Sequence, residues 1–198
     1  MMRRRPSVVL TVGLTLCLLG AAGAQAATTR TVSASNNAFS PATVSAAEGD
    51  TIKWVNDDFV QHTTTSTIAA PVGWSGSLFP GTPFSKTVPG AGTYAYHCDL
   101  HPGMNGKVRV PVIVTPSSGS IGATFTVKVS SAPAPNGFAY VPQVKIPGNR
   151  SWTSLSTTTS TSVSYVAQKT GKYLFRSKIK HGSQTGTAPS PTDSVMVG

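Results

Sequence analysis

The sequence has little cysteine, little charge and few of the residues that favour helices. Of its 198 residues, two are Cys, and charged residues make up 11%. Leu, Glu and Lys are sparse, whereas Thr, Ser, Val, Gly and Pro are plentiful. Val and Thr suit a pleated, half-buried surface, and Gly and Pro mark turns. The composition therefore predicts an all-β fold.

Long apolar runs are also missing, except for residues 8–20. That run follows Arg3, Arg4 and Arg5 and precedes Ala24-Gln25-Ala26, a small-residue cleavage pattern. It is too short to span a bilayer as a stable helix, and the layout is that of a secretory signal peptide. We therefore expect a signal peptide over residues 1–26 and a mature chain that is exported: secreted, at the cell surface or periplasmic, with no transmembrane segment.

Two other readings of the N-terminus fit less well. A lipoprotein site at Cys17 would need a small residue at position 16, where Leu16 stands. Arg4-Arg5 could open a twin-arginine signal, but the residues after it match that pattern poorly.

Export changes how the remaining cysteine is interpreted. Cys17 leaves with the signal peptide, so Cys98 is the single thiol of the mature chain. A single thiol excludes an internal disulfide, and it leaves a free thiol, an intermolecular bridge or a metal ligand. Because a reactive free thiol is a liability in an oxidising compartment, the count favours metal ligation.

Motifs of several other functional classes are absent. The sequence shows no Ser-His-Asp triad, no paired-carboxylate site and no phosphate-binding loop, so we expect no hydrolase and, more broadly, no enzyme. It also has no nucleic-acid-binding motif, and an exported chain would rarely meet nucleic acid. We therefore expect no nucleic-acid partner.

Short β-like runs separated by turn signals divide the mature chain into two predicted domains. The first is residues 27–115, the linker is residues 116–119, and the second is residues 120–198. Several short strands at this spacing predict antiparallel sandwiches. The strands expected in the first domain are residues 30–35, 43–46, 51–55, 62–66, 84–88, 93–97 and 106–114.

The second predicted domain also shows alternating apolar residues, at residues 125–129, 162–166, 173–180 and 192–197. Trp152 is expected in its core. Residues 171–176 and 187–191 resemble the last two strands of fibronectin type III modules. That resemblance implies a small β-sandwich of the immunoglobulin or fibronectin III kind.

Charge separates the two halves. Residues 27–115 carry five basic and five acidic side chains, whereas residues 116–198 carry eight basic side chains and one acidic one, a net charge of +7. An anionic cell-surface polymer or lipid is a possible partner of the basic half. The alternative is a solvated basic face that aids solubility.

One short segment concentrates metal-binding chemistry. Cys98, His101 and Met104 follow one expected strand and precede another. A loop held at both ends lets the scaffold impose ligand geometry. Structural zinc sites usually use several Cys or His ligands, whereas two His and one Cys with a weak axial Met are typical of blue copper.

A second histidine must come from elsewhere in the chain, and three candidates remain. His97 adjoins Cys98 on a strand, so its side chain should point to the opposite face. His181 lies in the second predicted domain beside Gly182 and is expected to be an exposed turn residue. His62 opens a strand after the Asp57-Asp58 turn, in a position to reach the ligand loop.

Cys98, His101 and Met104 together with His62 resemble the plastocyanin/azurin-type cupredoxins, and the spacing from His101 to Met104 is closest to the amicyanin-like pattern. The resemblance covers roughly residues 30–114. It implies a Greek-key β-sandwich with one type 1 copper ion bound by His62, Cys98, His101 and Met104. One departure is Thr63, where plastocyanins commonly have an Asn that helps tie the two ligand loops.

The resemblance further implies one-electron transfer by cycling between Cu(I) and Cu(II), with a transient redox-partner protein. His101 would be the electron port, and Pro102, Gly103 and Met104 would form a small apolar rim around it. Two other functions stay open: copper binding or delivery without a redox role, and a surface-attached protein whose basic half does the main work.

Overall fold

The computed structural model describes residues 26–184 and 186–198 of the chain. Over these ranges it has seventeen β-strands and no helix, so the prediction of an all-β fold is confirmed. Among the described residues, accordingly, no helix has the length and apolar character needed to cross a bilayer. Apart from Ala26, the predicted signal peptide lies outside the described residues.

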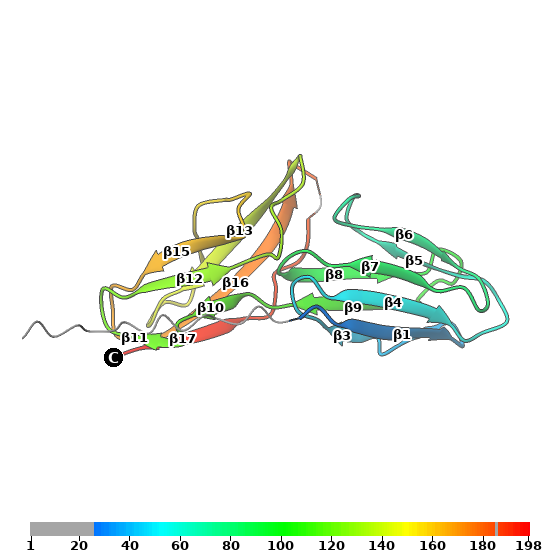
Figure 1. Ribbon diagram of the computed structural model, residues 1–198, viewed down its shortest axis with the longest axis horizontal. Helices are drawn as coiled ribbons and strands as arrows, with labels where there is room; N and C mark the ends of the chain where they lie inside the picture. The colour runs from blue at the N-terminus through cyan, green and yellow to red at the C-terminus, as the bar shows by residue number, and fades with distance from the viewer. Residues whose placement is uncertain (1–25, 185) are drawn as a thin grey trace, which may run out of the picture.

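The strands up to Val110 form two sheets (Figure 1). The first sheet has the order β2–β1–β4–β7, with bounds β1 Thr29–Ser35, β2 Ala38–Ser40, β4 Thr51–Asn56 and β7 Phe84–Thr87. The second has the order β3–β9–β8–β5–β6, with bounds β3 Thr43–Ser45, β5 His62–Ser66, β6 Ser75–Leu78, β8 Gly92–His97 and β9 Asn105–Val110. β1 pairs with β4 and β3 with β9 in parallel, and the other pairs are antiparallel.

Alternating burial turns one face of each sheet toward a shared core. Along β4, Ile52 and Trp54 are fully buried while Lys53 between them is half-buried, as the two-residue repeat of a strand requires. The Trp54 ring lies 5.2 Å from that of Trp74 and 5.3 Å from that of Tyr96, between centroids. Burying such side chains stabilises the fold by roughly 1.5–3 kcal/mol each, so this cluster anchors the two sheets to each other.

One strand expected from the sequence is in fact two. Residues 106–114 were expected to form a single strand, but β9 ends at Val110 and β10 (Ile113–Thr115) begins beyond Pro111. A proline lacks the amide proton that a sheet ladder needs. After this break the chain enters different sheets, because β10 pairs with β12 (Thr124–Lys128) and not with β8.

The strands from Ile113 onward form two further sheets. One has the order β10–β12–β15, and the other has the order β11–β17–β16–β13–β14. The bounds not yet given are β11 Ser118–Gly119, β13 Phe138–Lys145, β14 Thr153–Ser154, β15 Ser162–Val166, β16 Gly171–His181 and β17 Asp193–Val197. Ser118 and Gly119, in the expected linker, thus pair with Met196 and Val197.

Trp152 does not lie in the core of these sheets, contrary to expectation. Its side chain is half-buried, and the Arg176 guanidinium lies 4.1 Å above the centre of its ring. The described core of this half consists instead of residues on the strands, including Phe125, Tyr140 and Phe175.

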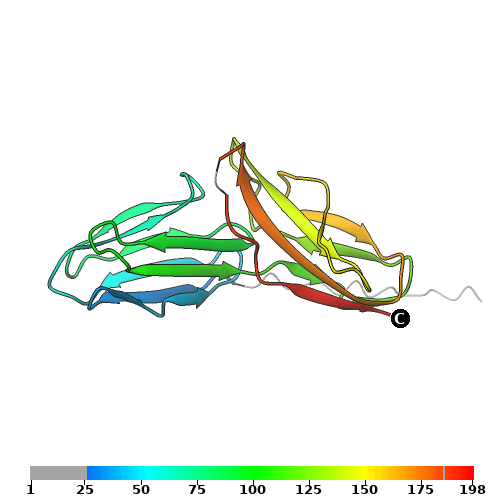
Figure 2. The same cartoon turned by 180° about the vertical axis from the view of Figure 1, so that it is seen from behind.

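The two pairs of sheets meet at the start of β8 (Figure 2). The Ala91 amide donates to the Val129 carbonyl at 2.8 Å, and the Thr93 amide donates to Ala188 at 2.9 Å. Buried Glu48 adds an ion pair across the junction, because Lys128 Nζ lies 3.4 Å from its carboxylate. β8 therefore starts against the second pair of sheets and carries the chain away from it.

Candidate metal centre

The residues singled out from the sequence meet at the far end of β8. His97 at the end of β8 pairs with Asn105 at the start of β9, and His62 at the start of β5 pairs with Leu78 at the end of β6. A six-residue strand is about 20 Å long. The loops at this end therefore lie about that far from the junction between the two pairs of sheets.

Three side chains converge there. His62 is fully buried, and its Nδ1 lies 3.9 Å from Cys98 Sγ. His101 is half-buried, and its Nδ1 lies 3.4 Å from the same sulfur. The nearest ligand atoms of the three residues all lie within 4.8 Å of one another. This spacing suits a single ion bound by one thiolate and two imidazoles.

The loop from Cys98 to Met104 is closed by its own backbone. The Cys98 amide donates to the Met104 carbonyl at 3.0 Å, and the Met104 amide donates to the His101 carbonyl at 3.2 Å. Gly103 takes a φ of 88°, a left-handed conformation that glycine adopts without steric cost. Met104 follows this turn with a side chain that is 1% exposed.

Thr63 ties the two ligand-bearing segments together, although it departs from the residue common in plastocyanins. Its amide donates to Cys98 Sγ at 3.3 Å. Its hydroxyl donates to the Asp99 carboxylate at 3.0 Å and accepts from the Asp99 amide at 2.7 Å. A second hydroxyl, that of Thr65, also donates to Asp99, and these bonds lower the pKa of the Asp99 carboxyl. The loops are thus joined without an asparagine.

The two other histidines lie apart from this group. His97 is half-exposed, and its Nε2 lies 3.0 Å from Asp99 Oδ1, as expected for a residue on the opposite face of β8. His181 ends β16 and is not the exposed turn residue that the sequence suggested. Its ring stacks on Phe138 at 4.1 Å between centroids, with 8° between the planes.

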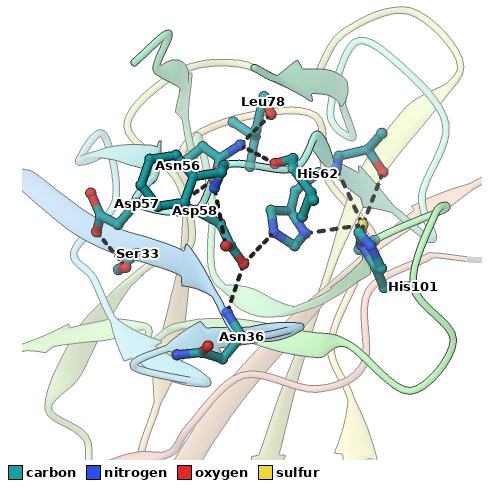
Figure 3. A network of polar contacts seen from close by, with 12 residues as sticks. Ser33, Asn36, Asn56, Asp57, Asp58, His62, Leu78 and His101 are labelled. Atoms are coloured by element: carbon teal, nitrogen blue, oxygen red, sulfur yellow. Dashed lines mark hydrogen bonds and ion pairs between the residues drawn. The ribbon is translucent and has the colours of Figure 1, made fainter. Parts of the chain in front are cut away.

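Asp58 is a contact of the site that sequence reasoning missed. Its Oδ2 lies 3.3 Å from His62 Nε2, on the side of the ring that faces away from Cys98 (Figure 3). The hydrogen bond donated by the Asn36 amide lowers the pKa of the Asp58 carboxyl most, and the contact with His62 lowers it further. The sequence indicates the Asp57-Asp58 pair only as a turn, because no local pattern shows that this turn folds back onto the His62 ring.

Exposed apolar side chains lie at this end of the sheets, but they differ from the expected rim of Pro102, Gly103 and Met104. Pro102 and Gly103 are exposed, whereas Met104 is buried. The exposed large apolar side chains at this end are Phe59, Val60, Phe79 and Leu100, between 50% and 97% accessible. They come from the segment before β5, the residue just after β6 and the ligand loop.

The donor set fits one metal better than others. Imidazole and thiolate ligands suit several transition metals, but a two-His, one-Cys set with a weak thioether is typical of blue copper. Zinc sites of a structural kind rarely rely on a lone Cys. His62, Cys98 and His101, with Met104 nearby, are therefore consistent with a single type 1 copper site.

Comparison with known proteins points the same way. The family model described as a cupredoxin-like domain matches residues 8–110, just over half of the chain. Similar solved structures include a reduced amicyanin mutant, with 29% identity over 40% of this chain and 79% of that chain, at a TM-score of 0.36.

Two further similar structures come from named organisms. A novel purple cupredoxin from Nitrosopumilus maritimus has 26% identity, over 40% of this chain and 97% of that chain, at a TM-score of 0.35. A copper-containing nitrite reductase from Thermus scotoductus has 27% identity, over 40% of this chain but 21% of that chain, at a TM-score of 0.38.

Proposed function

The chain belongs to the cupredoxin-like family, and we propose that it is an exported electron carrier with one type 1 copper ion. His62, Cys98 and His101 would hold the ion through two imidazoles and a thiolate, and the thioether of Met104 would be the weakest donor. The observation that supports this most is the approach of one ligand atom each from His62, Cys98 and His101 to within 4.8 Å of one another.

Copper would supply a one-electron couple, and the protein would hold its ligands in one arrangement for both oxidation states. The backbone bonds that close the Cys98–Met104 loop and the Thr63–Asp99 bridge support such rigidity. The Thr63 amide on Cys98 Sγ would also tune the potential, as hydrogen bonds to a ligand sulfur do. Little rearrangement would then accompany electron transfer.

His101 is the proposed point of electron entry and exit. It is half-buried, whereas His62 is fully buried, so a partner could approach the copper only from the side of His101. The rim formed by Phe59, Val60, Phe79, Leu100 and Pro102 would give a transient redox partner an apolar contact surface.

Voltammetry, a chelator challenge and reduction kinetics on the full-length, copper-loaded chain separate electron transfer from copper delivery. An electron carrier should show a reversible one-electron wave in voltammetry and should keep its copper when excess chelator is added. Replacing Leu100 with Ser at the rim should slow reduction by a donor protein and leave the visible spectrum unchanged. Rapid copper loss to the chelator, together with irreversible voltammetry, would instead favour the alternative of a copper-delivery module.

The same proposal assigns no catalysis to the chain. Cupredoxins are typically electron carriers, although the nitrite reductase above shows that related domains occur in enzymes.

Export is proposed from residues 1–26, with cleavage after Ala26. N-terminal sequencing of the protein recovered from outside the cytoplasm tests this proposal. A mature chain that begins at another residue would show that cleavage occurs elsewhere, and a chain that begins at residue 1 would show that no signal peptide is removed.

We further propose that the strands up to Val110 and those from Ile113 onward act as separate domains, and that the second binds an extended anionic cell-surface polymer. The expected boundary at residue 115 moves to the break at Pro111, because β10 pairs with β12. Lys172, Arg176, Lys178 and Lys180 alternate with buried residues along β16, so they share the outer face of their sheet. Strand residues two apart are about 6.8 Å apart, so the strand presents a row of cations.

Binding of the full-length chain to linear polyphosphate and to anionic lipid vesicles tests this proposal. Changing Lys172, Lys178 and Lys180 together to Gln should weaken polyphosphate binding, and added salt should weaken binding of the unchanged protein. The matched control changes Lys53, Lys86 and Lys107 to Gln, which removes the same total charge from the other half of the chain. This variant should bind polyphosphate as tightly as the unchanged protein. Equal losses in both triple variants, or binding to vesicles alone, would contradict a polymer site on β16.

A further inference from the structure

A carboxylate lies directly behind the buried histidine of the proposed copper site. The Nδ1 of His62 faces Cys98 Sγ, and its Nε2 lies 3.3 Å from Asp58 Oδ2 (Figure 3). The His62 side chain is 0% exposed, and that of Asp58 is 24% exposed. The carboxylate is therefore the polar partner of a ring that has no contact with bulk water.

Three hydrogen bonds hold Asp58 in this position, one of them from the Phe59 amide to Oδ1 at 3.0 Å. Its Oδ2 also accepts a hydrogen bond from the Asn36 amide at 2.9 Å, and its own amide donates to Asn56 Oδ1 at 2.9 Å. Asn56 in turn donates through Nδ2 to the carbonyls of Val60 and Leu78, each at 2.8 Å. The turn between β1 and β2 brings in Asn36, whose φ is 51°.

A neutral imidazole carries one N–H, and the acceptor it meets decides which nitrogen bears the proton. At His62 the acceptor lies at Nε2. A neutral His62 that donates to Asp58 would carry its proton on Nε2 and turn the lone pair of Nδ1 toward Cys98 Sγ. This is the tautomer that a metal ligand needs.

We infer that Asp58 is a positioning residue of the copper site: it fixes the tautomer and orientation of His62 and makes the ring a stronger ligand for Cu(II). The inference rests on the proposed function. A carboxylate that accepts from a ligand imidazole raises the basicity of the ring. Its negative charge also stabilises Cu(II) over Cu(I), because the oxidised ion carries the greater positive charge. Asp58 should therefore lower the reduction potential and slow copper loss.

The neighbouring Asp57 offers a matched control. Its carboxylate accepts a hydrogen bond from the Ser33 hydroxyl, and that bond is directed away from His62 (Figure 3). Asp57→Asn and Asp58→Asn remove the same charge from adjacent residues of one turn. Only the second changes the partner of the imidazole.

The experiment compares the two variants with the unchanged full-length chain, loaded with copper. Asp58→Asn should keep the blue colour and shift the Cu(II)/Cu(I) equilibrium toward Cu(I) about tenfold, or about 59 mV for one electron. Copper transfer to a chelator should be 10–100-fold faster, on the scale of changes to the partners of metal ligands. Asp57→Asn should change either quantity less than about twofold.

A second measurement keeps the test independent of how well the variant folds. Nitrogen-15 NMR of the unchanged, copper-free chain should show His62 protonated at Nε2. Protonation at Nδ1, or equal potentials in Asp57→Asn and Asp58→Asn, would overturn the role of Asp58 while the unchanged protein stays blue. If the unchanged protein is colourless with copper, the proposed function itself fails.

Discussion

At the scale of single residues, Met104 has the role that is simplest to isolate. Its carbonyl closes the ligand loop through the backbone, so a change of side chain leaves that bond in place. Leu replaces Met with little change in volume. We expect Met104→Leu to keep the blue colour and to raise the reduction potential by about 59 mV or more, because loss of the weak sulfur donor disfavours Cu(II). Voltammetry of the copper-loaded protein measures the change.

A second methionine provides the control for that substitution. Met196 is 55% exposed on β17, among the strands beyond the junction. Met196→Leu should leave the potential where it is. A potential that stays equally unchanged in Met104→Leu would show that Met104 is not the axial ligand.

Sequence reasoning reached His62, Cys98 and His101 because ligand types and strand ends can both be read along the chain. It missed the part of the site that depends on packing between segments. Thr63 acts through its backbone amide on Cys98 Sγ, a contact that residue identity does not encode. Asp58 reaches His62 as part of a network that also involves Asn36 in the β1–β2 turn, which no local pattern places beside the site.

At the scale of elements, β9 must pass very close to β8. A Cβ added to Gly106 would lie 2.2 Å from the ring of buried Tyr96, far inside van der Waals contact. We therefore expect Gly106→Ala to lower the free energy of unfolding by roughly 1–3 kcal/mol, the usual cost of overpacking a core. Urea unfolding of the copper-free chain measures it.

The control is Gly198→Ala, because a Cβ there would meet nothing within 4 Å. Gly106 also lies two residues after Met104, so the displaced ring should disturb the ligand loop and weaken copper binding. A Gly106→Ala protein with unchanged stability would mean that Tyr96 moves aside at no cost.

The strands expected from alternating or β-favouring residues are present, except that residues 106–114 form two strands. The structure also has strands that the sequence did not indicate, and these have physical causes. β2 and β6 are short and contain Ala, Ser or Gly, so neither shows a clear two-residue pattern. β13 contains Pro142, which argues against an interior strand, yet β13 lies between β14 and β16. At Pro111 the error is the reverse: the continuous apolar residues on both sides predicted one strand, but the chain changes from one sheet to another there.

At the scale of the whole molecule, the junction between the two pairs of sheets contains a carboxyl group whose charge opposes folding. Burial raises the pKa of Glu48 to about 7, although Lys128 partly counteracts the effect. In the unfolded chain the group titrates near 4.5. Between these values the folded state binds more protons, so the free energy of unfolding falls as pH rises from about 4.5 to about 7.

We expect Glu48→Gln to remove this part of the pH dependence and to stabilise the copper-free chain at pH 8 by a few kcal/mol, at about 1.36 kcal/mol per pKa unit. Urea unfolding at several pH values, for the variant and the unchanged chain, measures the difference. Identical slopes in the two proteins would contradict a raised pKa at Glu48.

The same junction lies at one end of β8, and the proposed metal centre lies at the other (Figure 1). The basic face of β16 and the rim around His101 thus belong to different parts of the molecule. A carrier built this way could be held by one surface while a redox partner uses the other.

Titration of the full-length chain with Cu(II), followed by its visible spectrum, decides whether the chain holds a type 1 site. We expect an intense blue band from charge transfer between Cys98 and copper, complete at one copper per chain. The band should be absent in Cys98→Ser, which keeps the size of the side chain but removes the thiolate. A colourless copper-bound protein, or a blue band that survives in Cys98→Ser, would contradict a type 1 site at these residues.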